Sequence, residues 1–174
     1  MPPRYFCLPL LAAFTLLCQT AQNPLPNSAI KDPDGQKVQF RFQTRPNSAQ
    51  IYTCKLSGQT YAWTGPDPDA ILVDSVHKLT VHHYKGPTWE ATDGSMVRSD
   101  ASLAKHYLPA GSNAIHWLEL PAKDTSERFS KVTFIHRTDT SGGMPPSGKP
   151  CGAEHAGDQE RVPYSATYLF YVPK

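Results

Sequence analysis

The 174-residue sequence lacks the signatures of several protein classes. It contains neither GxGxxG nor GxxxxGK[ST], so it has no recognisable dinucleotide or nucleoside triphosphate site. HExxH, HxH and CxxC spacings and the GxSxG elbow are also missing, and we predict no metal and no cofactor. Lysine and arginine form no run, and the formal net charge is only +2. Such a chain has no electrostatic basis for binding nucleic acid or anionic lipid.

Long apolar runs are equally scarce, and we predict no transmembrane segment. Arg4 precedes an apolar stretch over 6–17 that is too short to span a bilayer. Small and polar residues follow, so residues 1–21 are typical of a signal peptide cleaved after Ala21. A lipoprotein anchored at Cys18 is the alternative, although Leu17 replaces the small residue expected there. We therefore expect a secreted or periplasmic protein, with a flexible lead-in over 22–36 and a single β domain over 37–174.

Only four cysteines are present, and two of them lie in the predicted leader. The remaining pair is Cys54 and Cys151. An even count in an oxidising compartment predicts one disulfide bond between them. Two free thiols or a metal pair are the alternatives, but the missing CxxC spacing argues against a metal.

Helical periodicity is weak, while 17 prolines and 11 glycines interrupt nearly every segment. Apolar residues recur instead with period two, as at Val38, Phe40 and Phe42. We predict an all-β fold, a single antiparallel β-sandwich or flattened barrel of about eight strands with long loops. One short helix is expected over 99–106, and the polar segment 139–161 is expected to be a loop held by Cys151. The expected strands cover 38–42, 49–56, 61–64 (ended by the prolines of 65–68), 79–84, 115–120, 129–137 and 164–172.

Polar and aromatic residues are densest in the stretch 82–97, around the turn signals Gly86-Pro87 and Asp93-Gly94. Alternation places His83 on the apolar side of its strand with Leu79 and Val81. The same rule applied to 129–137 groups Val132, Phe134 and His136, so His83 and His136 would meet at one end of the core if the two strands are neighbours. The candidate site residues are His83, Tyr84, Trp89, Glu90, Asp93, Ser95 and His136.

These side chains allow more than one role. His83 could act as a base or metal ligand oriented by Glu90 or Asp93, or it could be a buried, hydrogen-bonded structural histidine. Ser95 could serve a Ser-His-Asp triad, but Asp-Gly-Ser is more typical of a plain turn. Trp89 is expected to be partly exposed and to contact a small molecule or glycan, unless it fills the core.

Several motifs resemble one family, the secreted bacterial and fungal domain of unknown function 3455. The resemblance covers most of residues 38–172 and is most specific in the string from His83 to Ser95. It includes His83 rather than His82, and it more often has Gln where this chain has His136, which argues against a catalytic role there. The matching pieces are Gln50–Cys54, His83–Ser95, Ile115–Leu118, Ile135–Thr138 with Gly142-Gly143, Pro146 and Cys151, and Val162–Ala166.

We therefore expect a secreted all-β protein, most simply a non-catalytic extracellular or envelope binding protein with a ligand pocket around residues 83–95. A hydrolase or metal-dependent enzyme using His83 with Glu90 and Asp93 is the alternative. The resemblance implies no reaction, and nothing in the sequence fixes an oligomeric state.

Overall fold

The computed structural model describes residues 25–26, 29–108 and 113–174. The predicted signal peptide, residues 1–21, lies outside the described residues, as does part of the predicted lead-in. The described chain is all β, as predicted, and nearly every strand pairing is antiparallel. The strands are β1 (Leu25–Pro26), β2 (Gln36–Thr44), β3 (Ala49–Ser57), β4 (Thr60–Asp74), β5 (Leu79–Tyr84), β6 (Thr88–Ala91), β7 (Met96–Ser99), β8 (Lys105–Leu108), β9 (Trp117–Thr125), β10 (Phe134–Gly142) and β11 (Gln159–Pro173).

The sheet curls on itself and closes into a ring. Its order is β9-β10-β11-β2-β4-β5-β6-β7, and β7 pairs with β9 to complete the circuit. Outside the ring, β8 pairs with β9 in antiparallel orientation, and β1 pairs with β8 in parallel orientation. A closed sheet has no free edge along the circuit and encloses a single interior.

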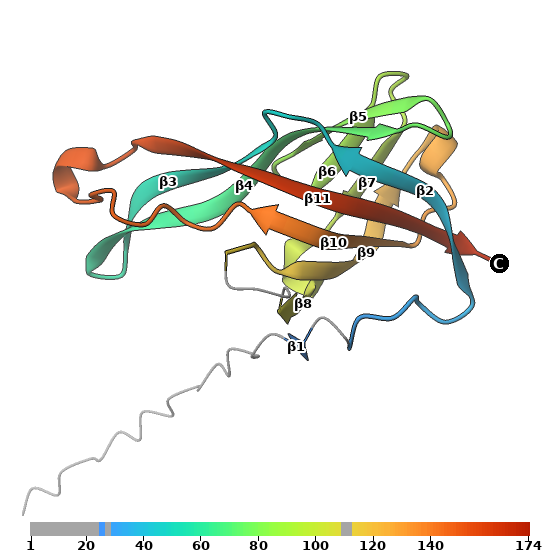
Figure 1. Ribbon diagram of the computed structural model, residues 1–174, viewed down its shortest axis with the longest axis horizontal. Coiled ribbons are helices and arrows are strands. Elements are labelled where there is room, and N and C mark those ends of the chain that lie inside the picture. Colours follow the sequence, from blue (N-terminus) through green and yellow to red (C-terminus); the bar gives the residue numbers. More distant parts are fainter. Residues whose placement is uncertain (1–24, 27–28, 109–112) are drawn as a thin grey trace, which may run out of the picture.

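Two strands are much longer than the rest and extend past the ring. β4 and β11 each contain 15 residues. Their inner parts belong to the ring, while their outer parts pair with β3. Figure 1 shows β3, β4 and the start of β11 projecting together to one side of the ring. We call these three segments the extension; it overhangs one end of the ring interior.

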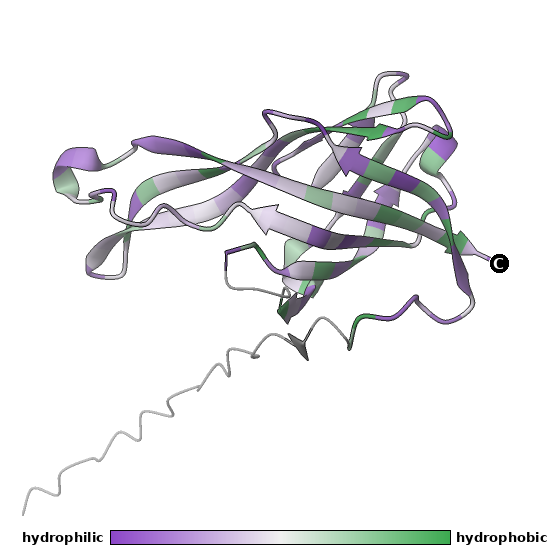
Figure 2. Cartoon of the chain, viewed as in Figure 1, coloured by the Kyte–Doolittle hydropathy of each residue, from purple (hydrophilic) through white to green (hydrophobic). Residues whose placement is uncertain are grey.

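Aromatic side chains fill the ring interior, and they come from the alternate positions expected of half-buried strands. Phe42 and Phe170 lie 4.9 Å apart between ring centroids, and Phe129 packs edge-on against Phe40 at 5.2 Å. Figure 2 shows the apolar positions alternating with polar ones along the strands. The core also contains Leu72, Val81, Trp89, Val97, Leu120, Ile135 and Val172.

Several sequence-based boundaries are wrong. The strand predicted to end at the prolines of 65–68 continues to Asp74, because a register shift opposite Ile51 and Thr53 accommodates the irregular backbone. The helix predicted over 99–106 is a 3-10 turn, η2 (Ala101–Leu103), followed by β8. The strand predicted over 129–137 begins only at Phe134, because the preceding residues form the 3-10 turn η3 (Glu127–Phe129).

The long segment between β10 and β11 is shorter than predicted but is held as expected. It includes the 3-10 turn η4 (Ala153–His155) and returns to β3 through a disulfide bond between Cys54 and Cys151. Gly143 begins this segment with φ +75°, and a Cβ there would lie 2.9 Å from the Cβ of Tyr164, so only glycine fits without rearrangement. No helix in the described residues is long and apolar enough to cross a membrane.

We predict that the disulfide contributes substantially to stability. The bond joins residues 97 apart in sequence. Closing a loop of that length stabilises by about 4–5 kcal/mol in the chain-entropy model. Replacing both Cys54 and Cys151 with alanine should lower the free energy of unfolding by up to about that amount, measured by urea denaturation. Wild-type protein under reductant is the control and should match the variant; an unchanged unfolding midpoint in both would contradict the prediction.

Candidate functional site

A cavity of about 590 Å³ occupies the end of the ring interior beside the extension. Residues from β3, β4, β5, β6, β8, β9, β10 and β11 line it, together with η2 and the β5–β6 turn. Most of the wall is apolar or aromatic. The apolar part of the wall includes Tyr52, Trp63, Pro66, Ala104, Ile115, Leu118, Leu120 and Met144.

The inner wall carries a stacked pair, His83 and Trp89. Their rings are nearly parallel, with centroids 4.3 Å apart, because the two residues are direct partners across β5 and β6. Nδ1 of His83 lies 2.9 Å from the backbone oxygen of Thr88. A carbonyl oxygen only accepts, so Nδ1 carries the proton and Nε2 is left as an acceptor.

The His83 ring is neutral over the physiological range. Burial lowers the pKa of His83 to about 3, and the positive charges of Arg137 and His82 act in the same direction. The hydrogen bond to Thr88 opposes the shift without overcoming it. His83 is therefore a weak base, suited to hydrogen bonding rather than to proton transfer near pH 7.

Arg137 brings a positive charge to the same wall. It lies on β10, and its side chain is buried. Nε and Nη2 donate to the backbone oxygen of His116 at 3.1 and 2.8 Å. Burial raises the pKa of Tyr168 and the charge of Arg137 opposes that shift, while the Tyr168 ring packs edge-on against His83. The pKa of His116 is lowered by burial first and by Arg137 second.

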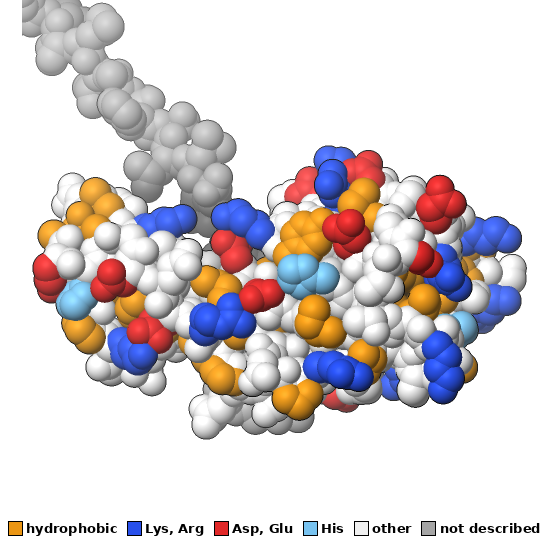
Figure 3. Space-filling model, turned by 90° about the horizontal axis from the view of Figure 1, so that it is seen from above, with side chains coloured by type: hydrophobic (Ala, Val, Ile, Leu, Met, Phe, Trp, Pro, Cys, Tyr) orange, Lys and Arg blue, Asp and Glu red, His pale blue; other side chains and the backbone are white. Residues whose placement is uncertain are grey.

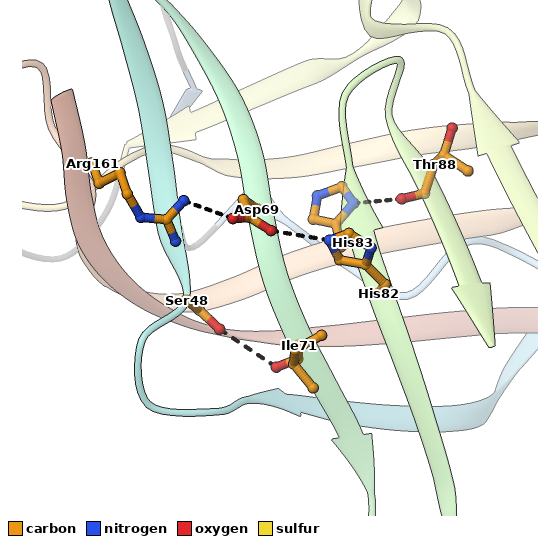
Figure 4. A network of polar contacts seen from close by, with 7 residues as sticks. All are labelled: Ser48, Asp69, Ile71, His82, His83, Thr88 and Arg161. Atoms are coloured by element: carbon orange, nitrogen blue, oxygen red, sulfur yellow. Dashed lines mark hydrogen bonds and ion pairs between the residues drawn. The ribbon is translucent and has the colours of Figure 1, made fainter. Parts of the chain in front are cut away.

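The candidate residues of the 83–95 segment do not converge on one site. Tyr84 donates to Glu90 Oε2 at 2.7 Å on the outer face, away from His83. His82 is also on that outer face and bonds Asp69, which in turn accepts from Arg161 (Figure 4). Successive strand residues point to opposite faces, so the string divides between the interior and the surface. Glu90 is consequently not an orienting partner for His83.

Asp93 and Ser95 form the β6–β7 turn. Asp93 accepts from the backbone nitrogen of Ser95 at 3.0 Å and pairs with Arg128 at 2.9 Å. Hydrogen bonds from Ser95 and then from Arg128 lower the pKa of Asp93 to about 2. The geometry is that of a structural turn, and it does not place Ser95 or Asp93 beside His83.

His136 is separated from His83 by the sheet. Its neighbours Ile135 and Arg137 face the interior, so His136 lies on the opposite side, 4.6 Å from the Tyr171 ring. Nε2 of His136 is 3.4 Å from Glu119 Oε2, and burial lowers the pKa of His136 despite that carboxylate. The expectation that the two histidines meet is wrong. That expectation counted the alternation of inward and outward residues from Val132, which is buried but precedes β10 and so does not set the alternation within the strand.

The expectation that Trp89 is partly exposed is also wrong, since its side chain is 0% exposed. Sequence reasoning missed Gln50, His106, His116, Arg137 and Tyr168, all of which line the cavity. One signal was available for Arg137. It stands two residues after Ile135, which places a charge on the apolar face of a strand.

Among the described residues, no group of three or more His, Cys, Asp or Glu is arranged to hold a metal ion. The family described as "Protein of unknown function (DUF3455)" matches residues 33–172. The chain belongs to this family. No curated protein and no solved structure matches it. The DUF3455 assignment accounts for the resemblance in the sequence motifs and names no activity.

We predict that His83 makes stability depend on pH. The unfolded chain gains a proton at this position as pH falls below about 6.5, whereas the folded chain does not until about pH 3. The stability that His83 contributes is therefore fully present above pH 6.5 and is lost as pH falls toward 3. In that range the free energy of unfolding should fall by up to about 1.4 kcal/mol per pH unit.

The test is urea unfolding of wild type and His83→Asn between pH 4.5 and 7.5, with Thr80→Asn on the same strand as control. The slope for His83→Asn should be shallower than that of wild type by up to about 1.4 kcal/mol per pH unit, because asparagine keeps a donor toward Thr88 but does not titrate. The other histidines whose pKa is lowered, His106, His116 and His136, contribute equally in all three proteins. Equal slopes in all three proteins would show that His83 is not the group responsible.

Proposed function

We propose that this DUF3455 protein is a secreted, non-catalytic binding protein whose ligand, a small and largely apolar molecule, occupies the cavity. The observation that carries the proposal is the cavity itself, about 590 Å³ in a chain whose remaining core is filled by aromatic rings. The cavity reaches from the buried pair His83 and Trp89 to the exposed residues Pro66, Ala101 and Met144, so a molecule from solvent can enter it. Its volume lies within the range of small-molecule sites, and its mixture of apolar walls with a few polar groups is typical of them.

The site chemistry favours binding over catalysis. A hydrolase or metal-dependent enzyme built on His83 needs Glu90 or Asp93 beside the imidazole. Glu90 instead accepts from Tyr84 on the outer face, and Asp93 pairs with Arg128 in a turn. A neutral His83 with its Nδ1 proton held by Thr88 is suited to accept a hydrogen bond from a ligand.

Secretion is part of the proposal and rests on two features. The first 21 residues have the composition of a signal peptide, and the Cys54–Cys151 disulfide is of the kind that persists in oxidising compartments. Figure 3 adds that the visible face mixes charges of both signs with apolar side chains, without a broad basic area. A small molecule in the cavity therefore fits better than a large polyanion on the surface.

We predict that the neutral fluorescent probe N-phenyl-1-naphthylamine binds at one saturable site. Ala104 lines the cavity, and Ala104→Trp would place an indole in that space and should lower the affinity at least tenfold. Ala153→Trp is the matched control, because Ala153 is exposed on η4 outside the cavity, and it should bind the probe as wild type does. Titrations should follow probe fluorescence, with near-ultraviolet circular dichroism showing that each variant keeps its packing.

Undiminished binding by a folded Ala104→Trp protein would mean that the probe lies elsewhere. Absence of saturable binding by wild type would reject the proposed function.

A further inference from the structure

Arg137 carries a buried positive charge without an acidic partner. Its side chain is 8% exposed. No carboxylate forms an ion pair with it, and every Asp and Glu of the chain falls within the described residues. The one carboxylate on the cavity wall, Asp67, is at the rim and pairs with Lys85 at 2.9 Å. The charge in the cavity is therefore not neutralised by the protein.

An unpaired buried charge is costly, and proteins normally pair it or bind an ion beside it. The backbone oxygen of His116 occupies the guanidinium edge formed by Nε and Nη2. A guanidinium has five N–H donors, and two of them bond this oxygen, so three remain, at the end formed by the two terminal nitrogens. That end has the spacing that receives the two oxygens of a carboxylate.

Two further residues of the cavity wall, Gln50 and Trp89, carry buried polar atoms without a partner. The side-chain amide of Gln50 is buried, and neither its nitrogen nor its oxygen has a hydrogen-bond partner. The indole nitrogen of Trp89 is likewise buried without an acceptor. These three atoms are closed to solvent even though their residues line the cavity, so they make the wall polar without themselves facing the open space.

We propose that the natural ligand of the cavity is an apolar, ring-sized carboxylate whose charged group is held by Arg137; this inference rests on the proposed function. The carboxylate neutralises the guanidinium, and the hydrocarbon part lies against Tyr52, Trp63 and Leu118. Nε2 of His83, which the bond from Nδ1 to Thr88 leaves as an acceptor, accepts from a hydroxyl on the ligand. The volume of about 590 Å³ fits a compact molecule rather than a polymer.

The test compares 2-naphthoate with 2-naphthalenemethanol, which has the same rings and no charge, by isothermal titration calorimetry at pH 7. Wild type should bind the carboxylate about ten- to a hundredfold more tightly, since charge-assisted hydrogen bonds contribute in that range. Arg137→Met should remove this preference and leave affinity for the alcohol within about threefold. Arg161→Met is the matched control, because Arg161 pairs with Asp69 on the outer face and should leave both affinities unchanged.

The outcomes separate the two proposals. Tight binding of the alcohol without a preference for the carboxylate would overturn the role of Arg137 and leave the binding function standing. Failure of both compounds and of N-phenyl-1-naphthylamine would overturn the binding function as well. Displacement of naphthoate by an equal concentration of inorganic phosphate would show a general anion site and overturn the apolar part. If Arg137→Met does not fold, Arg137→Lys replaces it as the test variant. Lysine keeps the charge but loses the two parallel N–H donors of the guanidinium, so Arg137→Lys should bind naphthoate at least threefold more weakly than wild type. That result, together with the wild-type preference for the carboxylate, then tests the role of Arg137.

Discussion

Closure of the sheet between β7 and β9 is the constraint on which the rest of the structure depends. Once the ring is closed, every second residue of eight strands faces one shared interior that must be filled. Phenylalanines from β2, η3 and β11 fill one part of it. At the other end β4 and β11 run past the ring to carry β3, so the interior continues beneath the extension and is not filled by side chains. The cavity thus results from strands of unequal length in a closed sheet.

The same enclosure determines the chemistry of the cavity wall. Low polarity around His83 disfavours its charged form, and the guanidinium of Arg137 disfavours it further. Burial and the nearby cation together keep His83 neutral, which leaves Arg137 as the buried positive centre of the wall, while Lys85 at the rim pairs with Asp67. A wall of this kind can recognise charge and orient a polar group, and its buried histidine is a poor base near neutral pH. Burial, charge and hydrogen bonding therefore all favour recognition over proton transfer.

The sequence predicted the parts of the fold that depend on local pattern. Period two at 38–42 and 164–172 located β2 and the inner part of β11, and the even cysteine count located the disulfide. It predicted the start of β4 but not its continuation to Asp74, because a bulge stabilised by pairing with β3 carries the strand through Gly65 and Pro66, and local propensity cannot show that pairing. It also assigned the wrong phase to β10, since Val132 is buried from a turn rather than from a strand. Because of this error, His136 rather than Arg137 was expected on the side of the sheet that His83 faces.

The string from His83 to Ser95 shows why density of polar residues is not the same as a site. Within it, His83 and Trp89 stack inside the ring, Tyr84 and Glu90 bond on the outside, and Asp93 with Ser95 forms a turn. Each pair is fixed by a different constraint: interior packing, cross-strand pairing on the surface, and turn geometry. These three constraints together restrict the residue type at nearly every position of this short hairpin. The resulting sequence motif is specific, but its residues do not share one chemical role. The residues that do converge on the cavity come from strands distant in sequence, and only closure of the sheet brings them together.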